Sequence, residues 1–459
     1  MSNETLETPG AQAAEDLIRF AAGLRFDALP PEVSLQGRRC LLNALGVALG
    51  ACGDPAAEIA LEVAREQGGE PQSRVLGYGA ALPTRGTALV DGVLSHVLDY
   101  DDTHMATILH PSPPILSAVL PVGEWLDVSL PELITAFVAG VEVASRVSLV
   151  LFPDHYDRGW HITGTAGVVG AAAAAGRLLG LDAGQMRHAL SLAATQAAGH
   201  REQFGSMAKS LHVGKAASDG ILSALLARRG YTSAHGGLEG RRGMFHVMTE
   251  GATPADLSEG LGKRWEIFEN GLKPYACGIV THSTIDAMRA LRSSIDGNAA
   301  DEVREIQLFV HPLVFELTNK TDPRTGVDGK FSIRFCAALG LIEDAAGAGQ
   351  FTDEMVKRPD IRRVMEAVRA TADPRLEVYQ SRAVLTTRDG RTLEQKVEAA
   401  RGIPQNPLSR EDIEDKFRSL AEPVLGAERA KSVIQALEEM EGIRTRDLVG
   451  RCVAPDPRL

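Results

Sequence analysis

Apolar residues recur at intervals of three and four through most of the first 260 residues, which is the spacing of one face of an α-helix. The pattern predicts helices at residues 13–26, 31–51, 56–67, 83–98, 130–150, 163–179, 185–198 and 213–229. Alternating strand patterns are almost absent from this half. We therefore expect an α-helical bundle here.

One of these helices is unusually rich in small residues. Gly164, Gly167 and Gly170 stand among alanines, so neighbouring backbones could approach closely. Thr163 is a candidate cap for its first turn. The composition predicts a central, buried helix.

The pattern changes near residue 265. Residues 303–310 alternate as a strand, and 377–397 read as a hairpin with its turn at 388–391. Helical patterns at 331–346, 352–357 and 360–371 lie between them, and amphipathic helices return at 409–420 and 427–439. The predicted fold class is therefore mainly α. It comprises an all-helical domain from residues 1–265 and 401–459 and a smaller α+β domain from 266–400.

Composition limits the classes of function. A net charge of −12 argues against nucleic acid as a partner, because phosphate binding needs a basic face. The five cysteines are scattered without a CxxC pair, so neither a disulfide framework nor a zinc ribbon is indicated. The polar N-terminus differs from a secretory signal, and the uncharged run 162–176 is too short to span a bilayer. We expect a cytoplasmic protein without a membrane partner.

The most concentrated chemistry lies between Asp99 and His110, where three carboxylates and two imidazoles stand between apolar runs. Buried ionisable groups are costly unless they are paired or used. The segment therefore predicts one wall of an active site, and we expect Asp99, nearest the apolar run, to be buried. Asp101 and Asp102 could instead cap the turn.

Three further candidates precede predicted helices. His161 lies just ahead of one, where the helix dipole would favour neutral imidazole as a base. Lys209, ahead of another, could serve as a base or as an anion anchor, and His212 is close by. Each could equally be an ordinary loop residue.

A last group of candidates lies at the expected domain junction, where clefts tend to form. It comprises Lys273, Tyr275, Cys277 and His282. Cys277 could be no more than a small buried residue, and His282 could simply begin a packed helix.

A metal site is the alternative interpretation of the acidic segment. The possible ligands are Asp99, Asp101, Asp102, His104 and His110. The chain has no HExxH sequence, and this segment has no HxH sequence. The nucleotide motifs GxGxxG and GxxxxGK[ST] and the nucleophile motif GxSxG are missing as well.

Six segments, in order along the chain, together resemble the MmgE/PrpD family. They are residues 98–103 (LDYDDT), 110–112 (HPS), 159–167 (GWHITGTAG), 208–214 (AKSLHVG), 238–240 (LEG) and 273–277 (KPYAC). The resemblance implies a helical domain with an α+β lid, a homodimer, and no cofactor or metal. It also implies chemistry on small di- or tricarboxylates in a cleft between the domains.

The resemblance places the site on Asp99, Thr103, His110, His161, Lys209 and Lys273. Known family reactions are dehydration of 2-methylcitrate, decarboxylation of cis-aconitate and epimerisation of iminodisuccinate. This chain differs from many relatives at His104, where an aromatic residue is common, and at Arg334 and Phe335, where Pro-Tyr is common.

The three reactions share the formation or quenching of a carbanion next to a carboxylate, which needs a base and nearby cations. We expect His161 or Lys209 to transfer the proton and Asp99 to orient a base. Carboxylate anchoring falls to Lys273 and His110, and Thr103 would bond the substrate. Tyr275, His212 and His282 are further candidates for substrate binding. A dehydratase of the 2-methylcitrate type is the first hypothesis, and an epimerase or decarboxylase is the second. A metal-dependent hydrolase using the Asp99–His110 segment is the third.

Overall fold

The computed structural model describes residues 9–455, which form two compact units. Unit 1 contains residues 9–97, 101–270 and 409–455. Unit 2 contains Leu98–Tyr100 and Gly271–Leu408. The three residues Leu98–Tyr100 join unit 2 although both of their chain neighbours belong to unit 1, a crossing that the sequence pattern did not predict.

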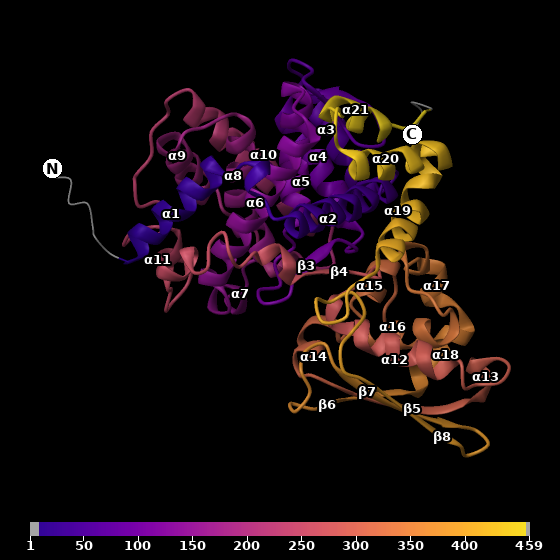
Figure 1. Ribbon diagram of the computed structural model, residues 1–459. Helices are drawn as coiled ribbons and strands as arrows, with labels where there is room; N and C mark the ends of the chain where they lie inside the picture. Colours follow the sequence, from indigo (N-terminus) through magenta and orange to yellow (C-terminus); the bar gives the residue numbers. More distant parts are fainter. Residues whose placement is uncertain (1–8, 456–459) are drawn as a thin grey trace. The chain divides into compact units, whose positions relative to one another are not determined.

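Unit 1 is built almost entirely from helices (Figure 1). They are α1 (Pro9–Gly23), α2 (Pro31–Gly50), α3 (Pro55–Gln67), α4 (Thr84–Val97), α5 (Ser112–Leu126), α6 (Leu130–Leu151), α7 (Asp154–Asp157), α8 (Ile162–Leu178), α9 (Ala183–Ala194), α10 (Ala208–Arg228), α11 (Met244–Met248), α19 (Arg410–Leu425), α20 (Ala427–Glu439) and α21 (Thr445–Arg451). Its strands are only two or three residues long: β1 (Ser73–Arg74), β2 (Ala81–Leu82) and β3 (Asp102–His104). A fourth short strand, β4 (Asn270–Leu272), lies where the chain passes into unit 2.

Helix α8 is the buried centre of unit 1, as its small residues predicted. It lies among α5, α6, α9 and α10 (Figure 1), and every residue from Ile162 to Gly176 is buried. A Cβ atom at Gly170 would lie 2.6 Å from the carbonyl oxygen of Gly140 on α6. One at Gly220 on α10 would lie 2.7 Å from the backbone nitrogen of Ala172. The helices therefore pack backbone against backbone.

The predicted cap of α8 is wrong by two positions. His161 occupies the N-cap with an extended backbone, and Thr163 lies inside the first turn. The Thr163 hydroxyl instead accepts the backbone N–H of His110 at 3.1 Å. It thus fixes the segment that enters α5 rather than the start of its own helix.

Helix α6 is long and apolar enough to cross a membrane by length and composition. In the residues described, however, it is a core helix, because 94% of its most apolar window is buried inside the protein. It also carries a fully buried ion pair between Arg146 and Glu142, at 3.2 Å. Arg146 donates further to the carbonyls of Leu257 and Glu259, which ties the segment after α11 to this helix.

Unit 2 holds a four-stranded sheet in the order β6-β5-β7-β8, with helices on one of its faces (Figure 1). The strands are β5 (Val303–Val310), β6 (Val368–Ala372), β7 (Ser381–Thr387) and β8 (Thr392–Val397). The helices are α12 (His282–Arg292), α13 (Ala299–Glu302), α14 (Leu313–Thr318), α15 (Gly326–Lys330), α16 (Ile333–Ile342), α17 (Asp353–Lys357) and α18 (Pro359–Ala367). The mainly α fold with a smaller α+β part is confirmed.

The predicted strand and hairpin are present in unit 2. β7 and β8 pair antiparallel from Ser381 opposite Val397 to Thr386 opposite Thr392, and Gly390 in the turn has φ +92°. The predicted helix at 360–371 is wrong at its end, because residues 368–372 form β6, parallel to β5. The alternating sequence Val-Arg-Ala-Thr-Ala suits an edge strand. Its apolar residues also continue the helical spacing of α18, so the pattern did not mark the boundary between α18 and β6.

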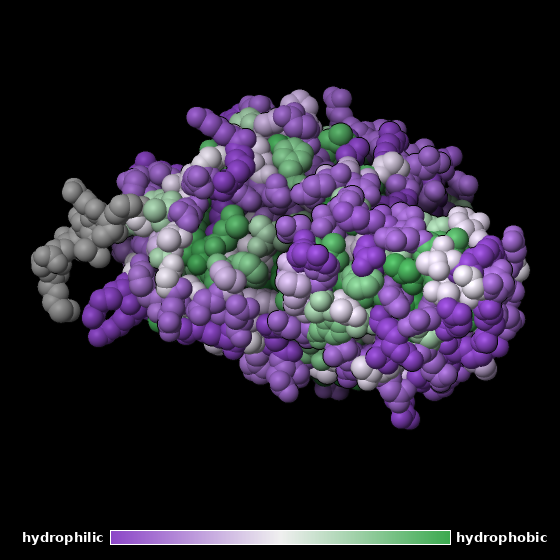
Figure 2. Space-filling view, turned by 90° about the horizontal axis from the view of Figure 1, so that it is seen from below, coloured by the Kyte–Doolittle hydropathy of each residue, from purple (hydrophilic) through white to green (hydrophobic). Residues whose placement is uncertain are grey.

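The face of the protein drawn in Figure 2 is mostly hydrophilic, with apolar side chains in separate patches. The large exposed apolar side chains of the described residues include Met207 and Leu211, at the start of α10. Their neighbour Lys209 is buried, so this turn exposes apolar side chains to solvent and directs a charged one into the protein.

The close packing of α8 is open to a direct test by Gly170→Ala. The added methyl would lie 2.6 Å from Ala144 Cβ. Overpacking of this kind lowers the free energy of unfolding by about 1–3 kcal/mol, which urea denaturation would measure. The control is Gly184→Ala, on the exposed start of α9, where only Asp182 Oδ1 lies near, at 3.3 Å. Equal stability of the two variants would contradict the packing described.

Candidate active site

A cluster of histidines around one carboxylate and one lysine lies in the core of unit 1. Four of its members, His110, His161, Lys209 and His212, were predicted site residues. Its positions lie at the end of α4, in the loops before α5 and α8, and in the first turns of α10. They are His96, Asp101, His110, His161, Lys209 and His212. All except the half-buried His212 are buried.

Asp101 is the centre of the first half of this cluster. Its Oδ2 lies 2.9 Å from Nδ1 of His96 and 2.8 Å from Nδ1 of His110. Two acceptors at that distance would repel, so each Nδ1 carries a hydrogen and each Nε2 is the atom that titrates. Burial would raise the pKa of Asp101, but the two histidines overcome it and hold that pKa well below its usual value. Burial also lowers the pKa of His96 to about 4, which leaves its ring neutral.

The same three residues are the group most capable of holding a metal in the described part of the chain. Their ligand atoms all lie within 4.8 Å of one another. Both Nδ1 atoms face Asp101 Oδ2, whereas Nε2 of His96 and Oδ1 of Asp101 are buried without a hydrogen-bond partner among the described residues.

His161 forms the second half of the cluster. Burial is the main cause that lowers its pKa well below the usual value, and repulsion from any positive charge on His96, Lys209, His110 or His212 adds to it. The neutral imidazole that we predicted is thus supported, but burial rather than the helix dipole is the larger cause. Nε2 of His161 is buried and has no hydrogen-bond partner among the described residues.

The other nitrogen of His161 meets a second imidazole. Its Nδ1 lies 2.9 Å from Nδ1 of His212. Two N–H groups or two lone pairs at that distance would repel, so one hydrogen lies between the rings. Burial and the charges of His200, Lys209 and Lys215 lower the pKa of His212.

Lys209 and Phe204 complete the surroundings of His161. The Phe204 ring meets the His161 ring edge-on with centroids 5.0 Å apart, and Nζ of Lys209 lies 5.4 Å from the Phe204 centroid. Lys209 is the second residue of α10, not a residue ahead of it as we predicted. It supplies the positive charge that an anionic substrate would need here.

Asp102 and His104, also in the acidic segment, have structural partners in unit 1. Asp102 accepts hydrogen bonds from Ser112 N and Oγ, at 3.1 and 2.5 Å, and thereby caps the start of α5. Burial raises its pKa to about 7. His104 faces Thr107 and Glu266, so it is no part of the cluster. Thr103 is fully buried on β3, and its Oγ1 has no partner among the described residues.

Asp99 and Lys273 form a separate pair inside unit 2. Nζ of Lys273 donates to the carbonyl oxygen of Asp99 at 3.0 Å and to its Oδ1 at 3.1 Å, with both side chains buried. Asp99 has φ +53°. It is buried at 5% exposed, as predicted, and Asp101 and Asp102 are buried as well, at 0%.

The remaining predicted residues of unit 2 lie in a local network. The Tyr275 hydroxyl donates to Asp286 Oδ1 at 2.5 Å and accepts from Arg289 at 3.1 Å. His282 begins α12 and meets the Tyr275 ring edge-on, with centroids 5.2 Å apart. Cys277 is fully buried, and burial raises the pKa of its thiol well above the usual value. This thiol is therefore unreactive, which agrees with the plain structural interpretation of Cys277.

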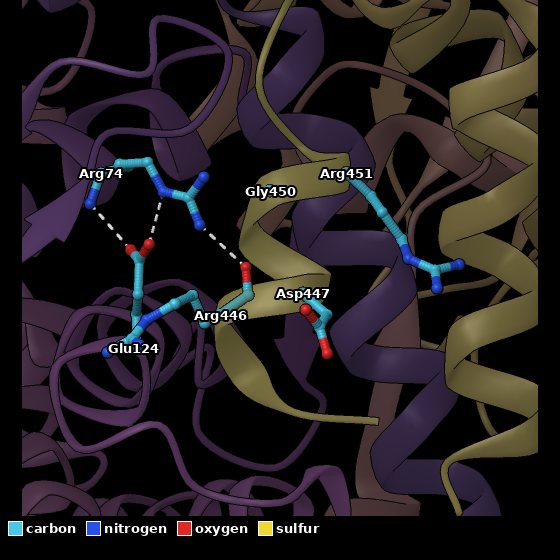
Figure 3. Close-up of a pocket in the computed structure, with 6 residues that line it drawn as sticks. All are labelled: Arg74, Glu124, Arg446, Asp447, Gly450 and Arg451. Carbon is cyan, nitrogen blue, oxygen red and sulfur yellow. Dashed lines mark hydrogen bonds and ion pairs between the residues drawn. The ribbon is translucent and has the colours of Figure 1, made fainter. Parts of the chain in front are cut away.

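Unit 1 also contains an open cavity of about 560 Å³ beside α21, drawn in Figure 3. None of the predicted residues lines it. Arg74 donates to Glu124 at 2.5 Å and to the Arg446 carbonyl at 2.8 Å. Arg451 extends away from that pair in Figure 3. The ion pair accounts for the charge of Arg74, and no chemistry is assigned to this cavity.

Sequence reasoning missed His96 and considered Asp101 only as a possible cap or metal ligand, not as the partner of two histidines. His96 lies on the last turn of an apolar helix, five residues before Asp101. A histidine on an apolar helix face just before an acidic segment was the available signal. The sequence alone did not show that His96 and Asp101 interact, because their contact depends on the turn after α4.

Comparison with known proteins agrees with the resemblance found in the sequence. Residues 15–256 match the MmgE/PrpD N-terminal domain, and residues 275–441 match the MmgE/PrpD C-terminal domain. The chain is similar to cis-aconitate decarboxylases of Mus musculus (27% identity over 94% of this chain and 91% of the relative) and Homo sapiens (27%, over 92% and 90%). A cis-aconitate decarboxylase of Aspergillus terreus is 26% identical over 91% of both chains.

The Asp99–Lys273 pair generates a prediction about stability. Asp99→Asn removes the carboxylate that pairs with Lys273 while keeping the shape and tolerating the positive φ. Breaking a buried pair in this way costs about 3–5 kcal/mol of unfolding free energy. Adding Lys273→Met should recover part of that loss, which a double-mutant cycle by urea denaturation would show. Effects that add to within about 0.5 kcal/mol would mean that the two groups do not stabilise each other.

Proposed function

Because the chain belongs to the MmgE/PrpD family, we propose that it is a lyase for a small di- or tricarboxylate, with decarboxylation of cis-aconitate as its reaction. The observation that carries this proposal is the neutral, buried His161 beside Lys209. Carbanion chemistry next to a carboxylate needs such a proton carrier together with a fixed positive charge. The named decarboxylases, similar over nine-tenths of their length, favour loss of CO₂ over the dehydration that the sequence first suggested.

The chemistry divides between two kinds of group. When the C–CO₂ bond breaks, its electron pair stays on carbon, and one proton must arrive there to complete the product. Nε2 of His161 has no other partner among the described residues and is the atom we assign to that transfer. Lys209 offsets the negative charge of the substrate while the carbanion exists.

The first half of the cluster supports this transfer. Asp101 fixes a hydrogen on Nδ1 of His110, so Nε2 of that ring, when protonated, would donate to a substrate carboxylate. The buried Thr103 is a further proposed contact of the substrate, and the anchoring of a carboxylate by Lys273, which Asp99 holds, remains a prediction. The reaction as we propose it uses no metal. The homodimer and the cytoplasmic location remain predictions.

A substrate panel tests the reaction. Purified protein would be incubated with cis-aconitate, citrate, 2-methylcitrate or iminodisuccinate, with and without EDTA. We expect CO₂ release from cis-aconitate alone, unchanged by EDTA. A new C=C absorbance with 2-methylcitrate would instead support the dehydratase, and a change of optical rotation with iminodisuccinate the epimerase. Activity lost with EDTA and restored by a divalent metal would favour a metal enzyme.

The assignment of His161 has its own test. His161→Ala should lower kcat/KM by about 10²–10⁴-fold, the usual cost of losing a proton-transfer group. The matched control is His246→Ala, which removes an exposed histidine of α11. Initial rates of CO₂ release would measure both. A His161→Ala enzyme as active as the control would refute the role of His161.

A further inference from the structure

His161 presents a physical difficulty as a proton carrier. Its side chain is 2% exposed, and both burial and the nearby Lys209 oppose a positive charge on its ring. Yet any imidazole that takes a proton at Nε2 while keeping its Nδ1 hydrogen becomes a cation. A buried cation without a counter-charge is costly. The structure must therefore provide another place for that charge.

His212, whose Nδ1 contacts Nδ1 of His161, can take that positive charge. The two nitrogens are 2.9 Å apart and share one hydrogen, and the His212 ring is half-buried rather than buried. Resting on the proposed function of His161, we propose that His212 accepts the Nδ1 proton of His161 whenever Nε2 of His161 gains a proton. The positive charge then forms on His212, which reaches solvent.

The proton balance of this step is simple. A new N–H bond forms at Nε2 of His161, the N–H bond at its Nδ1 breaks, and a new N–H bond forms at Nδ1 of His212. His161 is neutral before and after, and His212 gains one positive charge. Delivery of the proton to a substrate carbanion is the same movement in reverse, so each cycle restores the starting tautomers.

The backbone holds the two rings in this arrangement. Gly199 has φ +117°, and a Cβ there would lie 2.9 Å from Cγ of His212, so only glycine lets the ring lie against this loop. The carbonyl of the same Gly199 accepts the backbone N–H of His161 at 3.0 Å. One residue thus sets the position of both histidines. The charged and titratable groups that act on His212 besides His161 are His200, Lys209 and Lys215.

Two variants of similar shape separate charge acceptance from simple orientation. In His212→Asn the amide oxygen takes the place of Nδ1 and accepts the His161 N–H, but it cannot accept a proton. In His212→Asp a carboxylate stands there, which holds the same tautomer and can balance a positive charge. An orienting role alone would be served equally by both. A charge-accepting role would be served by His212→Asp and not by His212→Asn.

The first readout needs no substrate. NMR titration of protein labelled with ¹⁵N-histidine reports which ring nitrogens carry hydrogen. In the wild type we expect added acid to place two hydrogens on His212 while His161 keeps one. The pKa at Nε2 of His161 should be highest in His212→Asp and lowest in His212→Asn. Two hydrogens on His161 of the wild type, or equal titration in the two variants, would overturn the proposal even if the substrate is not cis-aconitate.

The second readout is catalytic. His212→Asn should lower kcat by about 10²–10⁴-fold with little change in KM, and His212→Asp should recover part of that loss. The control is His246→Asn, which changes an exposed histidine of α11. A His212→Asn enzyme with the kcat of this control would overturn the relay while leaving the assignment of His161 to be judged by His161→Ala.

Discussion

The close approach of α8 to α6 and α10 is the constraint on which the candidate site depends. Glycines on all three helices leave no room for side chains between the backbones. This packing buries His161 at the start of α8 and brings it within 2.9 Å of His212 on α10. Burial in turn makes His161 neutral at ordinary pH. The small residues along α8 thus allow the close packing that buries His161 at the start of this helix and keeps its ring neutral.

Burying so many ionisable groups together is costly, and the cluster offsets that cost by pairing. Asp101 is the one carboxylate set between two histidines, and its negative charge is stabilised by both of their Nδ1–H groups. His161 has no such carboxylate beside it and faces His212 instead. The two halves therefore differ in sign: one supports a positive charge near His110, and the other disfavours a positive charge on His161. Groups with opposed preferences in one place are typical of acid–base sites.

Much of the fold followed from periodicity. Most long helices of unit 1, strand β5 and the β7–β8 hairpin lie where the spacing of apolar residues placed them, whereas α5 and the short α7, α11 and α21 were not predicted. Strand β6 did not, because five residues that continue a helical spacing carry little strand signal. The site was predictable in its residue types but not in its pairing. Asp101 and Asp102 are neighbours with the same side chain, yet one joins two histidines and the other caps α5. Only the fold decides which partner each one meets.

We propose that the His161 cluster binds a small organic acid at the carbon that reacts and transfers a proton to it. A crystal structure of the protein with tricarballylate, a saturated tricarboxylate that cannot react, tests this most directly. We expect a tricarballylate carbon that carries a carboxylate to lie within about 3–4 Å of Nε2 of His161. One carboxylate of the ligand should contact Lys209. Ordered tricarballylate bound elsewhere, with no part of it touching His161, would contradict the account.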